Sequence, residues 1–155
     1  METRANVTEQ WLSEPEERAW RALQFMQMRL TAELGRLLAA DSELSYQDYL
    51  VLVALTDRPD GRMRLFEVGR QLGWEQSRLS HQVSRMTDRG LVLKEKCDSD
   101  RRGAFVVVTP KGRSEIERAA PGHAAAVRRL FVDVLRPDQL AALGDAAEAV
   151  LARLE

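Results

Sequence analysis

The sequence predicts a mainly α-helical fold with a small β-wing, a winged helix-turn-helix flanked by N- and C-terminal dimerisation helices. Three observations within residues 62–113 predict its centre. A short amphipathic stretch ends at Gly73, a second helical stretch covers residues 75–88, and two β-prone runs, 91–96 and 104–109, enclose a polar loop. This order of helix, turn, helix and hairpin is typical of a winged helix-turn-helix.

Length and composition predict one domain. The chain has 155 residues, of which 45% are apolar and 30% charged, as expected for a globular protein with a single core. We divide the domain, residues 1–155, into dimerisation helices at 14–40 and 110–155, a linking helix at 45–57 and a winged module at 62–109.

Composition also limits the cellular setting. No apolar run reaches the roughly 18 residues of a membrane helix, and the first residues lack the pattern of a signal peptide. A single cysteine, Cys97, excludes an internal disulfide. We therefore expect a cytoplasmic protein that does not enter a membrane.

Positive charge is concentrated in the winged module. Residues 62–113 contain twelve Lys and Arg against six Asp and Glu, a net charge of +6, whereas the whole chain carries −1. Such a distribution is expected where one module of a near-neutral protein binds a polyanion.

The first helix is predicted from a capping box. Ser13 and Glu16 stand three residues apart, and Pro15 suits the first turn of a helix. The following apolar positions repeat at helical spacing: Ala19, Leu23, Met26, Leu30, Leu34 and Leu37. A helix from Pro15 to about Ala40 would be roughly 40 Å long. Such a length favours a partner that covers part of it.

The linking helix has an equally legible start. Ser45 is the expected N-cap, Asp48 follows three residues later, and Leu44 and Tyr49 occupy the positions of a hydrophobic staple. The helix is apolar nearly all round, so we expect it to be buried. A turn cluster at residues 57–61 ends it.

The helix at 75–88 has the composition of a recognition helix. Leu79, Val83 and Met86 share one face, and Gly73 before it is the expected left-handed residue of the turn. The other side carries hydrogen-bonding and basic side chains: Ser77, His81, Ser84 and Asp88, bordered by Arg78, Arg85 and Ser80. Bases are read in the major groove by such donors and acceptors. The alternative is an ordinary solvated helix face.

The loop at residues 97–103 is the predicted wing tip. Arg101 and Arg102 could enter a minor groove, where a narrow A·T stretch attracts arginine. Asp100 would repel phosphate if it were free, and we expect it to hold an arginine in a charge-assisted pair. The alternative is an ordinary charged hairpin loop.

The C-terminal part is predicted to be helical, with an interruption. Thr109 and Pro110 suit the N-cap and first position of a helix, and Pro121-Gly122 should break or kink it before it resumes at His123. Pro137 begins the last helix, and Arg136 is a poor cap for it. Its apolar stripe consists of Leu140, Leu143, Ala147, Val150, Leu151 and Leu154. Amphipathic helices at both ends of the chain favour a homodimer.

Residues 65–112 resemble the MarR family of bacterial transcription regulators. The matching motifs are Leu-Gly at 72–73, Arg-Leu-Ser at 78–80, Met-Thr-Asp-Arg-Gly-Leu-Val at 86–92, Asp-Arg-Arg at 100–102 and Val-Thr-Pro-Lys-Gly at 108–112. The resemblance implies a homodimer that binds pseudo-palindromic DNA, usually as a repressor. It also implies relief by a small aromatic or phenolic ligand or by thiol oxidation.

The resemblance also implies roles for individual residues. Ser77, Arg78, His81 and Arg85 would contact the major groove and phosphates, and Arg102 would be the wing arginine, braced by Asp100. A ligand pocket between the dimerisation helices and the winged module would be lined by residues such as Trp20, Met28, Tyr49 and His123. For Trp20, Met28 and Tyr49 the alternative is ordinary core packing, and for His123 it is a structural or surface role.

The chain departs from the family pattern at several positions. Glu75 stands where a small N-capping residue is usual, and His81 stands in the reading face, so the operator sequence cannot be borrowed. Peroxide-sensing members have a cysteine in the first helix, which this chain lacks. Cys97 at the wing base is more simply read as an incidental thiol than as a redox sensor.

Other functional classes have little support in the sequence. It has no phosphate-binding loop, no nucleophile motif and no ligand set for a metal, so we expect neither catalysis nor a cofactor. The remaining alternative is a winged-helix module for non-specific DNA or protein binding. Salt dependence in the presence of competitor DNA separates this alternative from a sequence-specific regulator.

Overall fold

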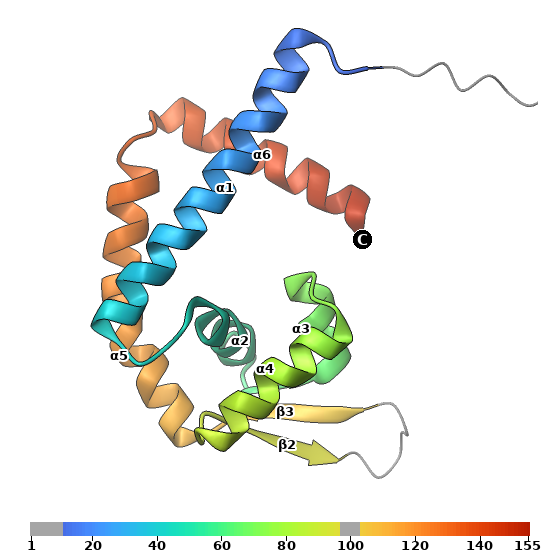
Figure 1. Ribbon diagram of the computed structural model, residues 1–155, viewed down its shortest axis with the longest axis vertical. Coiled ribbons are helices and arrows are strands. Elements are labelled where there is room, and N and C mark those ends of the chain that lie inside the picture. The colour runs from blue at the N-terminus through green and yellow to red at the C-terminus, as the bar shows by residue number, and fades with distance from the viewer. Residues whose placement is uncertain (1–10, 97–102) are drawn as a thin grey trace, which may run out of the picture. The chain divides into compact units, whose positions relative to one another are not determined.

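The computed structural model describes residues 11–96 and 103–155. It confirms the mainly α-helical fold with a small β-sheet (Figure 1). The elements are α1 (Glu14–Asp41), α2 (Tyr46–Thr56), β1 (Arg62–Arg64), α3 (Leu65–Leu72), α4 (Gln76–Asp88), β2 (Val92–Lys96), β3 (Ala104–Val108), α5 (Pro110–Val127), a π-helical segment η1 (Arg128–Val132) and α6 (Pro137–Leu154). The chain forms two compact units, with the boundary inside α1 between Glu33 and Leu34.

In the first unit, α1 starts at the predicted place. The backbone N–H of Ser13 donates a hydrogen bond to Glu16 Oε2 at 2.7 Å. This backbone hydrogen bond is the main cause that lowers the pKa of the Glu16 carboxyl, and a hydrogen bond from the Ser13 side chain lowers it further. Trp20, Phe25 and Met28 are all more than half exposed. This part of α1 therefore presents large apolar side chains to solvent.

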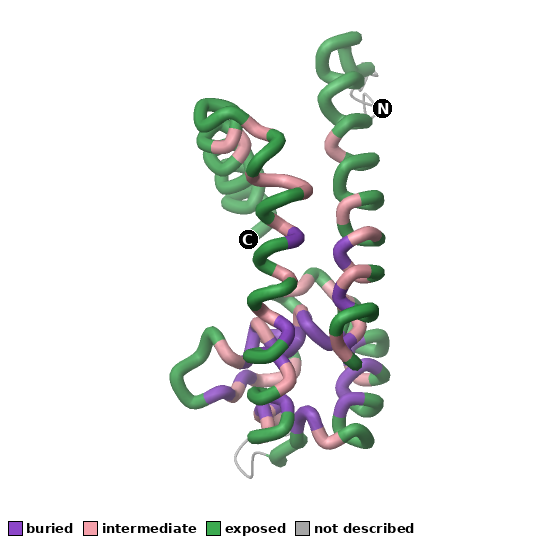
Figure 2. The backbone as a smooth tube through the Cα atoms, turned by 90° about the vertical axis from the view of Figure 1, so that its left-hand side faces the viewer, coloured by how far each residue is buried: buried purple, intermediate pink, exposed green. Residues whose placement is uncertain are grey.

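In the second unit, α2 is the central helix of the core. Its capping box is confirmed, because Asp48 N–H donates to Ser45 Oγ at 3.0 Å and Ser45 N–H donates to Asp48 Oδ2 at 2.9 Å. Val51, Leu52 and Leu55 are completely buried, as the apolar pattern predicts. Figure 2 shows the buried residues concentrated away from the two ends of the described chain, which are largely exposed.

The sheet has the strand order β1-β3-β2, and both pairs are antiparallel. In the hairpin, Val92 pairs with Val108 and Lys96 with Ala104. The pairing of β1 with β3, with Met63 opposite Val106, was not predicted from the sequence. A three-residue strand with two arginines is too short for an alternating pattern to indicate it. Met63 nevertheless fills the core, since it is only 2% exposed.

A break or a kink was predicted at Pro121-Gly122, and the break is wrong, because α5 continues through both residues to Val127. Proline removes one backbone hydrogen bond from a helix. Ile116 and Ala119 before Pro121 and Ala126 after it are all buried. Packing of one continuous face therefore keeps both sides of the proline helical. The interruption comes later, as the π-helical segment η1.

The last helix, α6, begins as predicted at Pro137. Arg136 provides no side-chain cap, and its backbone N–H donates instead to Gln139 Oε1 at 3.0 Å. No residue of α6 is buried. Within the part of the chain that the structure describes, no helix has both the length and the apolar character to cross a membrane.

Candidate nucleic-acid interface

The turn between α3 and α4 fixes how the second helix is presented. Gly73 has a φ of 65°, in the left-handed region that glycine adopts without strain, as predicted. Its N–H donates to Arg70 O at 3.3 Å, and Trp74 N–H donates to Gly69 O at 3.0 Å. These bonds close α3 and allow α4 to begin three residues later.

The inner face of α4 anchors the helix in the core. Leu79, Val83 and Met86 have no exposed surface, which confirms the apolar stripe predicted from the sequence. Glu75 precedes the helix and makes no capping hydrogen bond with its side chain. Burial on one side leaves the opposite side of α4 as the surface that a groove of DNA could receive.

That opposite side carries the predicted reading residues. Those that are exposed are Ser77, Arg78, His81, Ser84 and Arg85, while Ser80 is half-buried. The guanidinium of Arg78 lies over the ring of Trp74, 4.7 Å from its centroid. A cation–π contact of this kind restricts an otherwise mobile arginine. The helix therefore presents a polar, hydrogen-bonding surface with two arginines at its border.

A buried polar network behind this surface was not foreseen. Asp48, expected only as a capping residue, is 1% exposed, and Gln82 on the inner side of α4 is 5% exposed. Gln82 Nε2 donates to Asp48 Oδ1 at 2.6 Å, and Arg89 Nη1 donates to Asp48 Oδ2 at 2.7 Å. The sequence did contain a signal for this network, because Gln82 lies within the apolar stripe between Leu79 and Met86, and a buried polar group needs a hydrogen-bond partner.

The wing is built on a base of hydrogen bonds. Thr109 Oγ1 donates to Gly90 O at 2.6 Å and accepts from Gly112 N–H at 3.0 Å, so it both caps α5 and ties it to the start of the hairpin. On the sheet, Arg62 and Arg64 lie 4.1 and 5.0 Å from the centroid of the Phe105 ring. Arginine side chains thus gather beside the hairpin as well as on α4.

The wing tip itself lies outside the described residues. Cys97, Asp100, Arg101 and Arg102 fall in this segment, so their predicted roles stay predictions. The strands that lead to it, β2 and β3, are placed as the sequence predicts.

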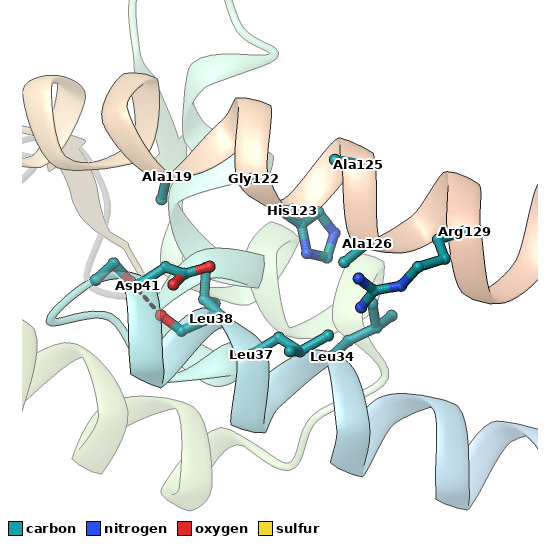
Figure 3. Close-up of a pocket in the computed structure, with 11 residues that line it drawn as sticks. Leu34, Leu37, Leu38, Asp41, Ala119, Gly122, His123, Ala125, Ala126 and Arg129 are labelled. Atoms are coloured by element: carbon teal, nitrogen blue, oxygen red, sulfur yellow. Dashed lines mark hydrogen bonds between the residues drawn. The ribbon is translucent and has the colours of Figure 1, made fainter.

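A pocket of about 250 Å³ lies between the end of α1 and the middle of α5 (Figure 3). Its wall combines apolar side chains with a carboxylate, an imidazole and a guanidinium: Leu34, Leu37, Leu38, Ala119, Ala126, Asp41, His123 and Arg129. His123 projects from α5 toward α1 in this view. The pocket lies within the second unit of the chain.

His123 is the chemically unusual residue of this pocket. Its Nδ1 is buried without a hydrogen-bond partner among the described residues. Burial lowers the pKa of the imidazole, which favours the neutral ring. The ring centroid lies 4.5 Å from that of Tyr49, whose hydroxyl pKa is raised by burial. Of the four predicted pocket residues, His123 lines this pocket, Tyr49 contacts the His123 ring without lining the pocket, and Trp20 and Met28 belong to the first unit.

No group of three or more His, Cys, Asp or Glu side chains that could hold a metal ion occurs in residues 11–96 or 103–155. Within these ranges the arrangement offers a polar helix face, arginine side chains beside the hairpin and a small mixed pocket. The first two suit contact with a nucleic acid backbone and base edges.

Comparison with known proteins agrees with this geometry. A family model described as a winged helix DNA-binding domain matches residues 44–112. The chain is similar to AbsC, a MarR family transcriptional regulator from Streptomyces coelicolor. The identity is 38%, the TM-score is 0.85, and the match covers 94% of this chain and 97% of AbsC.

A second similar structure is Sco3205, also a MarR family transcriptional regulator from Streptomyces coelicolor, which was solved in complex with DNA. The identity is 36%, the TM-score is 0.86, and the match covers 94% of each chain. No curated protein sequence matches this chain.

Proposed function

Because the chain belongs to the MarR family of transcriptional regulators, we propose that it is a homodimeric, sequence-specific repressor of a pseudo-palindromic operator. The observation that carries this proposal is α4, which is fully buried at Leu79, Val83 and Met86 and exposes a polar face opposite. A helix held in this way can enter a major groove as a rigid body.

The residues of α4 divide into two roles under this proposal. Ser77, His81 and Ser84 present donors and acceptors to base edges, with Ser80 at the border. Arg78 and Arg85 pair with phosphates, which position the helix but carry no sequence information. At the wing tip, Arg101 and Arg102 enter the minor groove and Asp100 braces Arg102.

Homodimerisation is supported by the apolar side chains that one chain leaves exposed. In α6 these are Val150, Leu151 and Leu154, which are 61, 58 and 76% exposed. The first unit adds Trp20, Phe25 and Met28. Large apolar side chains left exposed along a helix in this way are typical of protein–protein interfaces. A two-fold dimer places two copies of α4 on half-sites one helical turn apart.

The pocket beside His123 supports control by a small effector. A volume of about 250 Å³ is sufficient for a single aromatic or phenolic ring, since a cavity of about 150 Å³ already binds benzene. The unpartnered Nδ1 of His123 can exchange a hydrogen bond with a phenol or a ring substituent. If the effector binds better to a form with misplaced recognition helices, DNA affinity falls by the same factor, tenfold for about 1.4 kcal/mol of coupling.

Selection of bound sequences from a random duplex library tests the proposal. The expected product is a two-fold-symmetric site whose half-sites lie about ten base pairs apart. The protein should prefer this site to competitor DNA by about 10³-fold or more at two salt concentrations. The variant His81→Ala should shift base preference at one or two positions in each half-site, and Arg102→Ala should weaken binding.

The result that contradicts the proposal is equally distinct. Binding without an enriched sequence, which simply weakens as salt rises, would indicate counterion release alone. The chain would then be a winged-helix module for non-specific DNA or protein binding.

A further inference from the structure

Two polar side chains lie in the core behind the recognition helix. Among the described residues, Asp48 and Gln82 are the buried polar ones, and they bind each other across 34 positions of sequence. Removing such groups from water is unfavourable unless they are fully paired. Their partners therefore show what the pair holds in place.

Asp48 is a fixed anchor. Its Oδ2 accepts from the backbone N–H of Ser45 at 2.9 Å and from Arg89 Nη1 at 2.7 Å, and its Oδ1 accepts from Gln82. Arg89 also donates through Nη2 to Glu43 O at 2.6 Å. The carboxylate is thus tied to the start of α2 and to the residue that follows α4.

The anchor determines which way the Gln82 amide points. An ionised carboxylate can only accept, so the amide nitrogen must face Asp48 and the amide oxygen must face away from it. The opposite orientation would set two acceptors against each other in the core. Gln82 therefore presents an acceptor toward its other neighbour, one turn further along the helix.

That neighbour is Arg85, whose Nη2 donates to Gln82 Oε1 at 2.7 Å. Arg85 itself is exposed on α4. Gln82 engages one of the five N–H donors of the guanidinium, so the others stay available for a phosphate. A side chain that is ordered before binding loses less conformational entropy when the complex forms.

We propose that Gln82 is a positioning residue, which holds Arg85 in its phosphate-binding orientation with Asp48 as the anchor. The proposal rests on the DNA-binding function proposed above. Because the Gln82 side chain is buried, it does not contact DNA itself, and the proposal predicts that it contributes to DNA affinity only through Arg85.

A double-mutant cycle tests this coupling on the selected operator. Arg85→Ala should weaken binding about tenfold, the factor that about 1.4 kcal/mol represents. Gln82→Met, of similar size, should weaken it by a smaller factor, and adding it to Arg85→Ala should change nothing further. Gln47→Met, an exposed glutamine of α2, is the matched control and should bind as the wild type does. Independent, multiplying effects would overturn the proposal.

If Gln82→Met does not fold, a measurement on the free wild-type protein tests the positioning role of Gln82 instead. Nitrogen-15 NMR relaxation of the arginine side chains should show Arg85 more ordered than the exposed Arg153 of α6. An equally mobile Arg85 would overturn the positioning role. An ordered Arg85 in a protein that enriches no duplex would instead overturn the proposed function.

Discussion

Gly112 stands where the base of the wing meets the first turn of α5. A Cβ at this position would overlap the carbonyl oxygen of Leu91 and lie 3.1 Å from Val108 Cγ2. The N–H of Gly112 is also the donor that Thr109 Oγ1 accepts at 3.0 Å. The close backbone approach explains why glycine ends the Thr-Pro-Lys-Gly motif that leaves the hairpin.

We expect Gly112→Ala to lower the free energy of unfolding by about 1–3 kcal/mol, because backbone rather than a flexible side chain must move. Gly144→Ala is the matched control, since a Cβ there meets nothing within 4 Å. In an open helical position alanine is favoured over glycine by up to about 1 kcal/mol. Thermal unfolding, followed by circular dichroism, measures the stability of both variants. Equal shifts in Tm would contradict the close contact between residue 112 and the Leu91 carbonyl.

Also at the residue scale, periodicity correctly predicted which side chains of a single helix face inward or outward. It did not predict contacts between side chains of two different helices. Leu79 inward and His81 outward follow from about 100° of rotation per residue. The bond between Gln82 and Asp48 joins residues 34 apart, and only tertiary packing brings them together. The contact of His123 with Tyr49 is of the same kind.

Among the elements, helix ends that depend on local contacts were predicted correctly, both at N-caps and at Gly73, whereas the break expected at Pro121 does not occur. Ser45 and Thr109 were read correctly as N-caps, because a cap is a local contact within four residues. Pro121 was read wrongly as a break, because its neighbours on the buried face maintain the helix. Packing can outweigh the local preference of a proline. At the two N-caps, local preference and packing favour the same structure.

Pro121→Ala should therefore stabilise the protein. Alanine restores the missing backbone donor within α5 and is favoured over proline by about 3 kcal/mol in a helix interior. Part of this gain is offset, because the unfolded chain has more conformational entropy without the proline. Pro110→Ala is the control, because Pro110 stands in the first turn of the same helix, where no such donor is needed. Denaturant titration should give a higher midpoint for the first variant alone. A lower midpoint for Pro121→Ala would mean that α5 requires the geometry of proline there.

For the whole molecule, net positive charge and unburied apolar residues are concentrated in different parts of the chain. The winged module carries the net positive charge, and most of its large apolar side chains belong to the core, although Phe66 and Leu93 are exposed. In contrast, α6 is 18 residues long, has an apolar stripe and buries none of it. The sequence predicted this stripe, but periodicity cannot say whether a helix packs on its own chain or on a partner.

The proposed dimer is tested by placing a charge in that stripe. We expect Leu151→Glu to shift the mass in solution from dimer to monomer, because burying an unpaired carboxylate in an apolar interface is unfavourable. Ala149→Glu, on the opposite side of the same helix, introduces an equal charge and should leave the dimer intact. Light scattering coupled to size exclusion measures the mass of each variant.

The same pair of variants connects assembly with DNA binding. A monomer retains the α4 surface, so Leu151→Glu should bind an isolated half-site as the wild type does. It should lose the additional affinity that the wild type has for a complete operator, where two tethered half-site contacts form together. Wild-type mass together with wild-type operator affinity in Leu151→Glu would remove α6 from the dimer interface. Dimerisation would then have to depend on other exposed apolar side chains, those of Trp20, Phe25 and Met28 first among them.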